Sequence, residues 1–147
     1  EQTRSASIDD VGGILELIEP LEREGVLLKR SRELLENEIR QFRIIERDGR
    51  IIACAALYPF PEENCGEVAC IVSHPDYRGG QRGQRLLQEI EREARVQGLD
   101  RVFVLTTQTE HWFLEQGFEE RSRDALPAQK QALYNLQRNS KVFFKSL

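Results

Sequence analysis

The chain has 147 residues, of which 39% are hydrophobic, and its 21 lysines and arginines against 25 aspartates and glutamates give a formal net charge of −4 at pH 7. This length suits one globular domain, and the acidic balance argues against general nucleic-acid binding, which needs a basic face. No apolar run approaches membrane-spanning length. The three cysteines are too few and too scattered for a disulfide framework or a zinc knuckle, so we expect a reducing, cytoplasmic setting and no metal.

The first half of the chain shows apolar periodicities that predict a strand, two helices and then a hairpin. In chain order we expect a strand at Thr3–Ser7, helices from Asp9 or Asp10 to about Ile18 and over Arg32–Gln41, and strands at Arg43–Arg47 and Ile51–Tyr58. Ser31 favours the start of the second helix as its N-cap, and Asp48–Gly49 is typical of a two-residue hairpin turn. Between the two helices, Pro20–Arg30 is expected to form a loop.

The second half predicts strands and helices in alternation. In chain order these are a buried strand at Val68–Ser73, a helix at about Gly83–Gln97, a strand at Arg101–Leu105, a short helix at Thr109–Gln116, a return strand from Phe118, a helix at Pro127–Tyr134 and a strand at Lys141–Phe144. Gly98 and Gly117 follow two of these helices, where glycine commonly ends a helix.

A glycine-rich turn lies between the buried strand and the long helix. It consists of Tyr77, Arg78, Gly79, Gly80, Gln81, Arg82 and Gly83. Such a turn presents backbone N–H groups to an anion, and the helix N-terminus and the two arginines add positive charge. This arrangement predicts a pyrophosphate cradle. It is not a Walker loop, because Gly83 is followed by Gln84, and the plainer alternative is a helix entry that needs positive φ angles.

The residue order Val-x-His-Pro-x-Tyr-Arg-Gly resembles the acyl-coenzyme A loop of the GNAT superfamily of N-acetyltransferases. In the family pattern Gln/Arg-x-x-Gly-x-Gly/Ala, Arg78 and Gly83 match the first and last positions, and Gln81 stands where glycine is usual. A second block, His111–Phe118, is similar to the family's helix ending in aromatic-x-x-x-Gly-Phe. In it, Phe113 replaces a tyrosine that protonates the departing thiolate in many members. The resemblance implies acetyl-CoA as co-substrate and an α/β (α+β) GNAT N-acetyltransferase fold, a mixed central sheet with helices on both faces.

Longer strings, among them GGILELIEPLEREGVLLKRSRE and GEVACIVSHPDYR, resemble the acetyltransferase domain of the bacterial N-acetylglutamate synthase family. This closer resemblance implies acetyl transfer to the α-amine of L-glutamate, the first step of arginine biosynthesis, by direct attack of the deprotonated amine. Residues 1–147 are then a single N-acetyltransferase domain. Since the chain begins at Glu1, we expect it to be a C-terminal fragment of a longer synthase that carries an amino-acid-kinase-like domain. A homo-oligomer remains open.

Free glutamate has two carboxylates, and the planar fork of arginine can hold a carboxylate with two parallel hydrogen bonds. The synthase resemblance implies that Arg30 and Arg138 bind the substrate, with Lys130 as a third cation and with Leu28 and Cys70 in the same site. The alternative is that both arginines are ordinary surface residues. Cys70 is expected on the strand face opposite Glu67, because it lies three residues further on, and a core cysteine is favoured over a nucleophile.

Glu67 is the candidate general base, acting on the amine directly or through one water; an exposed glutamate at the strand edge is the alternative. The resemblance assigns the donor to the acetyl oxygen, and the pantetheine contacts, to Ile71 and Val72, and a bulge in this strand would free such groups. Thr106 is implied as a substrate contact or proton donor, with Tyr134 as the alternative acid. The turn from Arg78 to Gly83, that is Arg78, Gly79, Gly80, Gln81, Arg82 and Gly83, is expected to bind the coenzyme.

Two other functions stay open at this point. One is an N-acetyltransferase for another amino acid, a small amine or a protein N-terminus, which would need no paired arginines. The other is a non-catalytic regulatory domain that binds acyl-CoA, which Gln81 and Phe113 favour because both depart from the family pattern. His74 and His111 are isolated, so they favour structural roles over a metal site.

Overall fold

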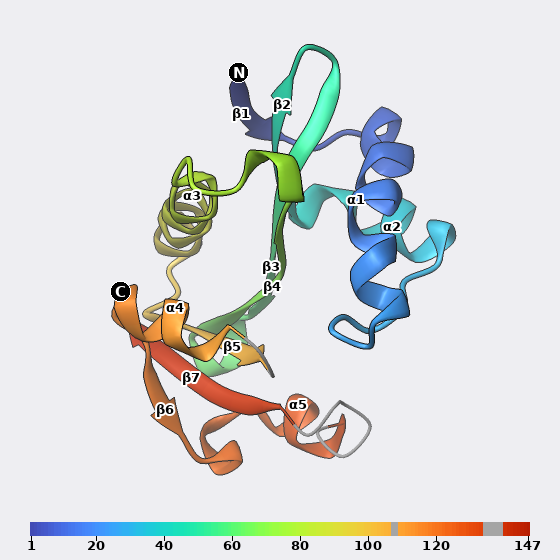
Figure 1. Cartoon of the computed structure of the whole chain (residues 1–147). Coiled ribbons are helices and arrows are strands. Elements are labelled where there is room, and N and C mark those ends of the chain that lie inside the picture. The colour runs from blue at the N-terminus through green and yellow to red at the C-terminus, as the bar shows by residue number, and fades with distance from the viewer. Residues whose placement is uncertain (107–108, 134–139) are drawn as a thin grey trace.

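The computed structural model describes residues 1–106, 109–133 and 140–147, and for residues 132 and 133 it describes the backbone alone. Within these ranges the strands form one sheet in the order β1-β2-β3-β4-β5-β7-β6 (Figure 1). The strands are β1 (Gln2–Ser5), β2 (Phe42–Arg47), β3 (Arg50–Phe60), β4 (Cys65–Ser73), β5 (Arg101–Thr106), β6 (Glu119–Arg121) and β7 (Lys141–Ser146). The β4–β5 pair is parallel and the other pairs are antiparallel, so the mixed sheet is confirmed.

Helices cover both faces of this sheet, as expected. They are α1 (Val11–Arg23), α2 (Arg32–Glu38), α3 (Arg82–Val96), α4 (Glu110–Glu115) and α5 (Ala128–Leu133). On one face α1 and α2 bury Ile14, Ile18 and Leu35 against β2, β3 and β4. On the other face α3 buries Leu86 and Ile90 in a second apolar cluster, and Figure 1 shows the sheet between the two layers. Apolar burial on both faces accounts for the position of the helices.

The local signals in the sequence placed most elements correctly. The side chain of Ser31 accepts a hydrogen bond from the Leu34 amide at 3.1 Å and so caps α2. Asp48 and Gly49 have φ angles of 52° and 78°, which suit a tight hairpin between β2 and β3. The loop predicted from Pro20 was wrong, because α1 continues through Pro20 to Arg23. A proline inside a helix costs about 3 kcal/mol, and packing of the neighbouring α1 residues against the core offsets this cost.

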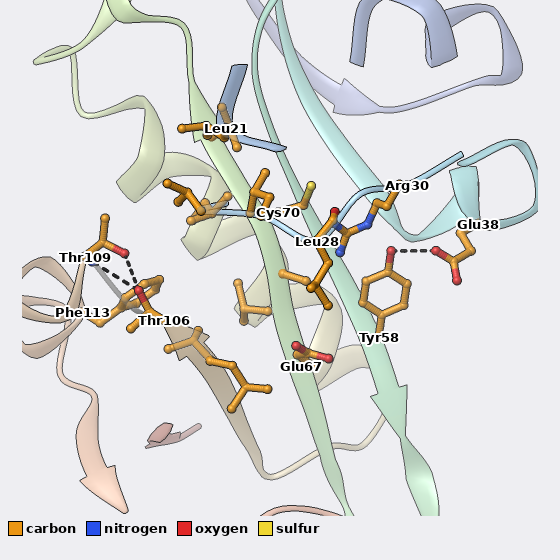
Figure 2. Close-up of a pocket in the computed structure, with 18 of the residues that line it drawn as sticks. Leu21, Leu28, Arg30, Glu38, Tyr58, Glu67, Cys70, Thr106, Thr109 and Phe113 are labelled. Carbon is orange, nitrogen blue, oxygen red and sulfur yellow. Dashed lines mark hydrogen bonds between the residues drawn. The ribbon is translucent and has the colours of Figure 1, made fainter. Parts of the chain in front are cut away.

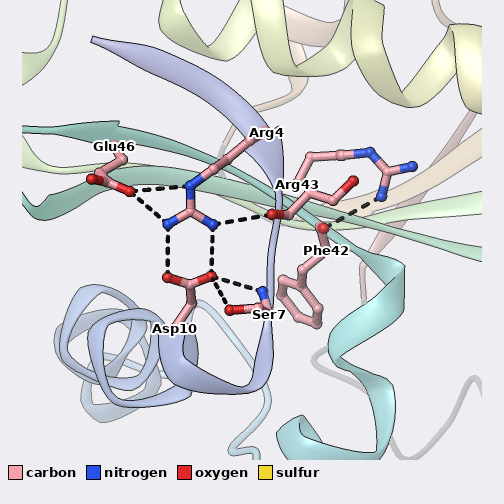
Figure 3. Close-up of polar contacts among 7 residues, drawn as sticks. Arg4, Ser7, Asp10, Phe42, Arg43 and Glu46 are labelled. Carbon is pink, nitrogen blue, oxygen red and sulfur yellow. Dashed lines mark hydrogen bonds and ion pairs between the residues drawn. The ribbon is translucent and has the colours of Figure 1, made fainter.

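An ion-pair network fixes the first strand and the first helix to the sheet (Figure 3). The Arg4 guanidinium donates to both carboxylate oxygens of Asp10, at 2.9 and 3.0 Å, and to Glu46 on β2 at 2.6 Å. The hydrogen bonds from Arg4 hold the pKa of Asp10 below its ordinary value. The backbone N–H of Ser7 also donates to Asp10 at 2.7 Å, which satisfies a carboxylate that is only 10% exposed.

Two irregularities of β4 create the space for a site. The register of β3 against β4 shifts between Cys54 and Ala56, so Ala55 alone lies opposite two residues of β4, Cys70 and Ile71. This β-bulge, which the sequence analysis named as a way to free backbone groups, places Cys70 at a φ of 55°. On the other edge, β4 and β5 pair only over the first three residues of each strand, through Glu67, and then separate.

Candidate active site

A cavity of about 830 Å³ lies where β4 and β5 separate. The loop between α1 and α2, strands β3, β4 and β5, and helices α4 and α5 all contribute to its lining (Figure 2). Nine of the residues predicted for the site line it: Leu28, Arg30, Glu67, Cys70, Ile71, Val72, Arg78, Thr106 and Lys130. The fold thus brings together residues from both halves of the chain.

Glu67 and Lys130 form an ion pair in this cavity. Nζ of Lys130 lies 3.0 Å from Oε1 of Glu67, and the two side chains are 15% and 12% exposed. Glu67 is therefore a partly buried carboxylate rather than an exposed residue at a strand edge. Its neighbour Lys130, on α5, places a positive charge directly beside the carboxylate.

The loop that carries Arg30 is held in place through the backbone of this residue. The Arg30 backbone N–H donates to the Glu22 carboxylate at 2.7 Å, which ties the loop to α1, and its Nη1 donates to the Leu28 carbonyl at 3.3 Å. Burial works against its charge, but Cys70, Tyr58 and Glu67 around it outweigh burial and raise the pKa of Arg30. The guanidinium points into the cavity in Figure 2, so Arg30 is not an ordinary surface arginine.

Tyr58 and Glu38 belong to the same site, although the sequence analysis did not single them out. Tyr58 lies directly opposite Glu67 in the β3–β4 register, and therefore on the same face of the sheet. Its hydroxyl donates to Oε1 of Glu38 at 2.8 Å, and burial followed by this contact raises the pKa of Tyr58. In the sequence, a tyrosine in an apolar strand has the pattern of an ordinary core residue. Only the pairing of Tyr58 with Glu67 across the two strands places it in the site.

Cys70 belongs to the apolar cluster against which Tyr58 packs, and Tyr58 lies opposite Glu67, so the prediction that Cys70 and Glu67 point to opposite faces was wrong. The physical reason is the bulge, because one inserted residue breaks the alternation of side chains along β4. Cys70 is 5% exposed, and the buried Cys54 donates its thiol hydrogen to the Cys70 carbonyl at 3.3 Å. The Cys54 thiol, and then the charge of Arg30, lower the pKa of Cys70 although burial opposes its ionisation.

Hydroxyl groups gather where β5 ends. Thr106 is 7% exposed, and its Oγ1 lies 2.9 Å from Oγ1 of Thr109 and accepts from the Thr109 amide at 3.2 Å. Phe113 on α4 lines the cavity beside them but is 3% exposed and packs edge-on against Trp112 and Phe118. At this position the chain offers an apolar ring and not a hydroxyl.

Two residues of the glycine-rich turn have left-handed backbone angles. Gly79 has a φ of 88° and Gln81 a φ of 59°, so the position where the family usually has glycine does take a left-handed conformation. A Cβ on Gly80 would lie 2.4 Å from Nη1 of Arg82, and one on Gly83 would lie 3.4 Å from the Trp112 ring. Gly80 and Gly83 therefore leave room for the side chains of Arg82 and Trp112 at the start of α3.

Arg78 faces the cavity, whereas Arg82 braces the turn from within. Nη1 of Arg82 donates to the Tyr77 carbonyl at 2.8 Å, and the guanidinium stacks over the Tyr77 ring. Its remaining nitrogens bind Glu1, which also pairs with Arg85 at 2.5 Å, and these contacts lower the pKa of Glu1 to about 2. The arginine pair therefore already binds a carboxylate beside the turn.

The remaining predicted residues lie elsewhere. His74 accepts a hydrogen bond from the Asp76 amide at 3.1 Å and lies 2.9 Å from an Arg50 nitrogen, which is a structural role. His111 is an exposed side chain on α4. Within residues 1–106, 109–133 and 140–147, no cluster of candidate ligands is arranged to hold a metal, and no helix is long and apolar enough to cross a bilayer. Tyr134 and Arg138 lie outside the described residues.

Comparison with known proteins places this geometry in context. The chain matches the Acetyltransferase (GNAT) family over residues 12–118. It is 60% identical to an amino-acid acetyltransferase of Ectopseudomonas mendocina over 147 residues, which are 100% of this chain and 34% of that protein. The chain therefore spans about a third of the length of the curated relatives it matches.

Solved structures of acetyltransferases are also similar to this chain. The chain superposes with a TM-score of 0.96 and 44% identity on N-acetylglutamate synthase from Neisseria gonorrhoeae complexed with coenzyme A and N-acetyl-glutamate, covering 99% of this chain and 35% of that one. For the same enzyme complexed with coenzyme A and L-arginine, the TM-score is 0.89 at 43% identity, with 99% and 33% covered. The similarity therefore extends over almost all of the present chain.

Proposed function

Because the chain belongs to the acetyltransferase (GNAT) family, we propose that it transfers the acetyl group of acetyl-CoA to the α-amine of L-glutamate, giving N-acetyl-L-glutamate and CoA. The observation that carries this proposal is the joint presence of Arg30, Glu67 and Lys130 in one cavity beside the coenzyme turn. In this cavity Glu67 can accept a proton from the amine, and Arg30 and Lys130 can pair with the carboxylates of the substrate. The similarity to a synthase complexed with coenzyme A and N-acetyl-glutamate supports the same substrate.

Glu67 acts as the general base in this proposal. The ammonium of glutamate must lose a proton before its nitrogen can attack the thioester carbon, and the Glu67 carboxylate accepts that proton directly or through one water. The substrate ammonium replaces the Lys130 ammonium as the partner of Glu67. Lys130 is then released toward a substrate carboxylate at the same end of the cavity.

Arg30 and Arg138 bind the carboxylates of glutamate, with Leu28 and Cys70 in the surrounding wall. Arg30 points into the cavity from a loop that Glu22 ties to α1, so the backbone that carries the guanidinium needs little ordering when substrate binds. The planar fork of arginine holds a carboxylate through two parallel hydrogen bonds. The Cys54 thiol and the charge of Arg30 account for the lowered pKa of Cys70, so no nucleophilic role is needed to explain it.

The amides of Ile71 and Val72 polarise the acetyl carbonyl. Attack forms a tetrahedral intermediate whose oxygen carries the negative charge. Ile71 lies in the bulge, Val72 is the next residue and is in register with Cys54 on β3, and both lie beyond the point where β5 stops pairing with β4. Collapse of the intermediate breaks the carbon–sulfur bond. Thr106 or Tyr134 protonates the leaving sulfur. Alternatively, the thiolate leaves without a proton from the enzyme, because a thiol is fairly acidic, with a pKa of about 8.5.

The turn formed by Arg78, Gly79, Gly80, Gln81, Arg82 and Gly83 binds the pyrophosphate of coenzyme A. The left-handed angles at Gly79 and Gln81 turn the backbone amides, and the start of α3 adds the positive end of its dipole. Arg82 keeps the turn in shape through Tyr77. An amino-acid-kinase-like domain, a homo-oligomer and a cytoplasmic location stay predictions for the full protein.

The test is release of coenzyme A from acetyl-CoA with glutamate against a panel of other amino acids and small amines. We expect turnover that is selective for glutamate and that yields N-acetyl-L-glutamate by mass spectrometry. Turnover with an amine that lacks a second carboxylate would keep the coenzyme site but contradict the substrate. Coenzyme binding without turnover of any amine would favour a regulatory domain.

A further inference from the structure

The Arg30 side chain lies next to two groups for which the proposed mechanism has no role, Tyr58 on β3 and Glu38 at the end of α2. Tyr58 donates its hydroxyl hydrogen to Oε1 of Glu38 at 2.8 Å. Both residues line the same cavity as Arg30, and Figure 2 shows the tyrosine ring between Glu38 and the cavity with its oxygen toward the guanidinium. A partly buried hydroxyl is therefore bonded to a carboxylate and lies beside an arginine.

The bond to Glu38 determines which way the Tyr58 hydroxyl faces. A phenol has one hydrogen to donate and oxygen lone pairs that accept. Because the hydrogen is committed to Glu38, the lone pairs are turned toward the side on which Arg30 lies. The contact between Tyr58 and Arg30 affects the pKa of both residues. Tyr58 contributes to the raised pKa of Arg30, and Arg30 opposes the rise in the pKa of Tyr58 that burial causes.

The remaining contacts of Arg30 do not fix its fork. Its backbone amide is held by Glu22, and its Nη1 makes a long bond of 3.3 Å to the Leu28 carbonyl of the same loop. A guanidinium on a loop has several rotamers, and a bidentate grip on a carboxylate requires one of them. The sheet supplies a rigid partner, since Tyr58 is paired in register with Glu67.

We propose that Tyr58, oriented by Glu38, is a positioning residue that aims Arg30 at a carboxylate of the substrate. This inference rests on the proposed function, because it deepens the role of Arg30 in binding glutamate. The same cross-strand pair then serves both ends of the substrate: Glu67 receives the proton of the amine, and Tyr58 orders the cation that holds a carboxylate. Tyr58 contacts neither reacting atom and acts through Arg30.

The test compares Tyr58→Phe with the wild-type chain in steady-state assays of coenzyme A release. Phenylalanine keeps the ring and its packing but removes the hydroxyl. Because Tyr58 acts on the substrate only through Arg30, the expected change is roughly fivefold to tenfold, smaller than the loss of a direct hydrogen bond between the substrate and a charged group. We expect KM for glutamate to rise by about that factor, with kcat and KM for acetyl-CoA changed less than about twofold. The thermal midpoint of unfolding reports whether the variant is folded.

A double variant separates positioning from a general structural role. If Tyr58 acts through Arg30, Tyr58→Phe should raise KM for glutamate in the wild-type background and leave it unchanged in the Arg30→Ala background. Equal factors in both backgrounds, or an equal rise in KM for acetyl-CoA, would overturn the inference. Absence of any glutamate turnover by the wild-type chain would instead overturn the proposed function, and the inference with it.

Substitutions at Glu38 test the orientation of the hydroxyl. Glu38→Ala removes the acceptor and should raise KM for glutamate as Tyr58→Phe does, whereas Glu38→Gln keeps an oxygen acceptor and should restore most of the affinity. Glu36→Ala is the matched control on the same helix, because Glu36 is 43% exposed and pairs only weakly with Arg32 at 3.9 Å. A Glu38→Ala variant that behaves like Glu36→Ala would contradict the orienting role.

Discussion

The coenzyme turn and the substrate cavity are two anion-binding regions built in opposite ways. The turn is a contiguous segment, Tyr77–Gly83, whose shape follows from the backbone angles of neighbouring residues such as Gly79 and Gln81. The cavity takes Arg30 from a loop, Glu67 from β4 and Lys130 from α5, and Arg30 and Lys130 are 100 residues apart along the chain. Damage to the turn should therefore be local, and damage to the cavity should depend on which element is touched.

The largest effect is expected in the cavity, from Glu67→Gln. The amide keeps the size of the side chain but cannot accept the proton of the amine, so kcat should fall by about 10²-fold to 10³-fold. The measurement is coenzyme A release at saturating substrates, with coenzyme affinity determined separately and expected to stay unchanged. Glu63→Gln, at an exposed glutamate just before β4, is the control. Turnover within tenfold of the wild-type rate would remove Glu67 from the mechanism.

The next effect is expected from Arg30→Ala, which removes a charged grip on the substrate. A hydrogen bond to a charged group contributes about 1.5–3 kcal/mol, so KM for glutamate should rise by roughly 10-fold to 100-fold while coenzyme affinity stays constant. Arg23→Ala serves as a control, since this arginine at the end of α1 has a side chain that is 71% exposed. If both arginine variants kept the wild-type KM for glutamate, the carboxylate site would have to lie elsewhere.

In the turn, Gly79→Ala should weaken coenzyme binding and leave the substrate cavity intact. Gly79 has a φ of 88°, and a Cβ there costs about 1–2 kcal/mol even though no atom lies within 4 Å. If the turn relaxes to avoid this strain, the dissociation constant of coenzyme A should rise about fivefold to 30-fold, as measured by calorimetric titration. Gly25→Ala carries the same kind of strain, at a φ of 75°, in a loop outside the turn. Equal weakening by both variants would mean that the effect is global and not local.

The smallest effect is expected from Gln81→Gly. Glycine adopts the observed φ of 59° without strain, and this gain of about 1–2 kcal/mol is partly offset by the greater freedom of glycine in the unfolded chain. The free energy of unfolding should therefore rise by about 0.5 kcal/mol in urea denaturation, with coenzyme affinity equal or better. Gln84→Gly, inside α3, should lower it by about 1 kcal/mol. A loss of stability in Gln81→Gly would show that the glutamine side chain has a structural role here.

The sequence by itself determined the features that depend on near neighbours. The hairpin at Asp48–Gly49, the cap at Ser31 and the helix after the glycine-rich turn follow from local backbone preferences. The left-handed angle at Gln81 fits the family pattern, which usually has glycine at that position. The resemblance to the GNAT superfamily is confirmed on the same basis, because its motifs are contiguous strings. The extent of α1 was misjudged at Pro20, where tertiary packing outweighed a local preference.

Only the tertiary structure decided how the substrate cavity is assembled. The bulge in β4 places Cys70 on the same side as Glu67, and neither periodicity nor propensity could show it, because one inserted residue leaves no mark in the amino-acid pattern. The pair of Tyr58 with Glu38 and the ion pair of Lys130 with Glu67 likewise join residues that are distant along the chain. Such contacts depend on strand register and on the separation of β4 from β5, which the balance of packing across the whole sheet sets.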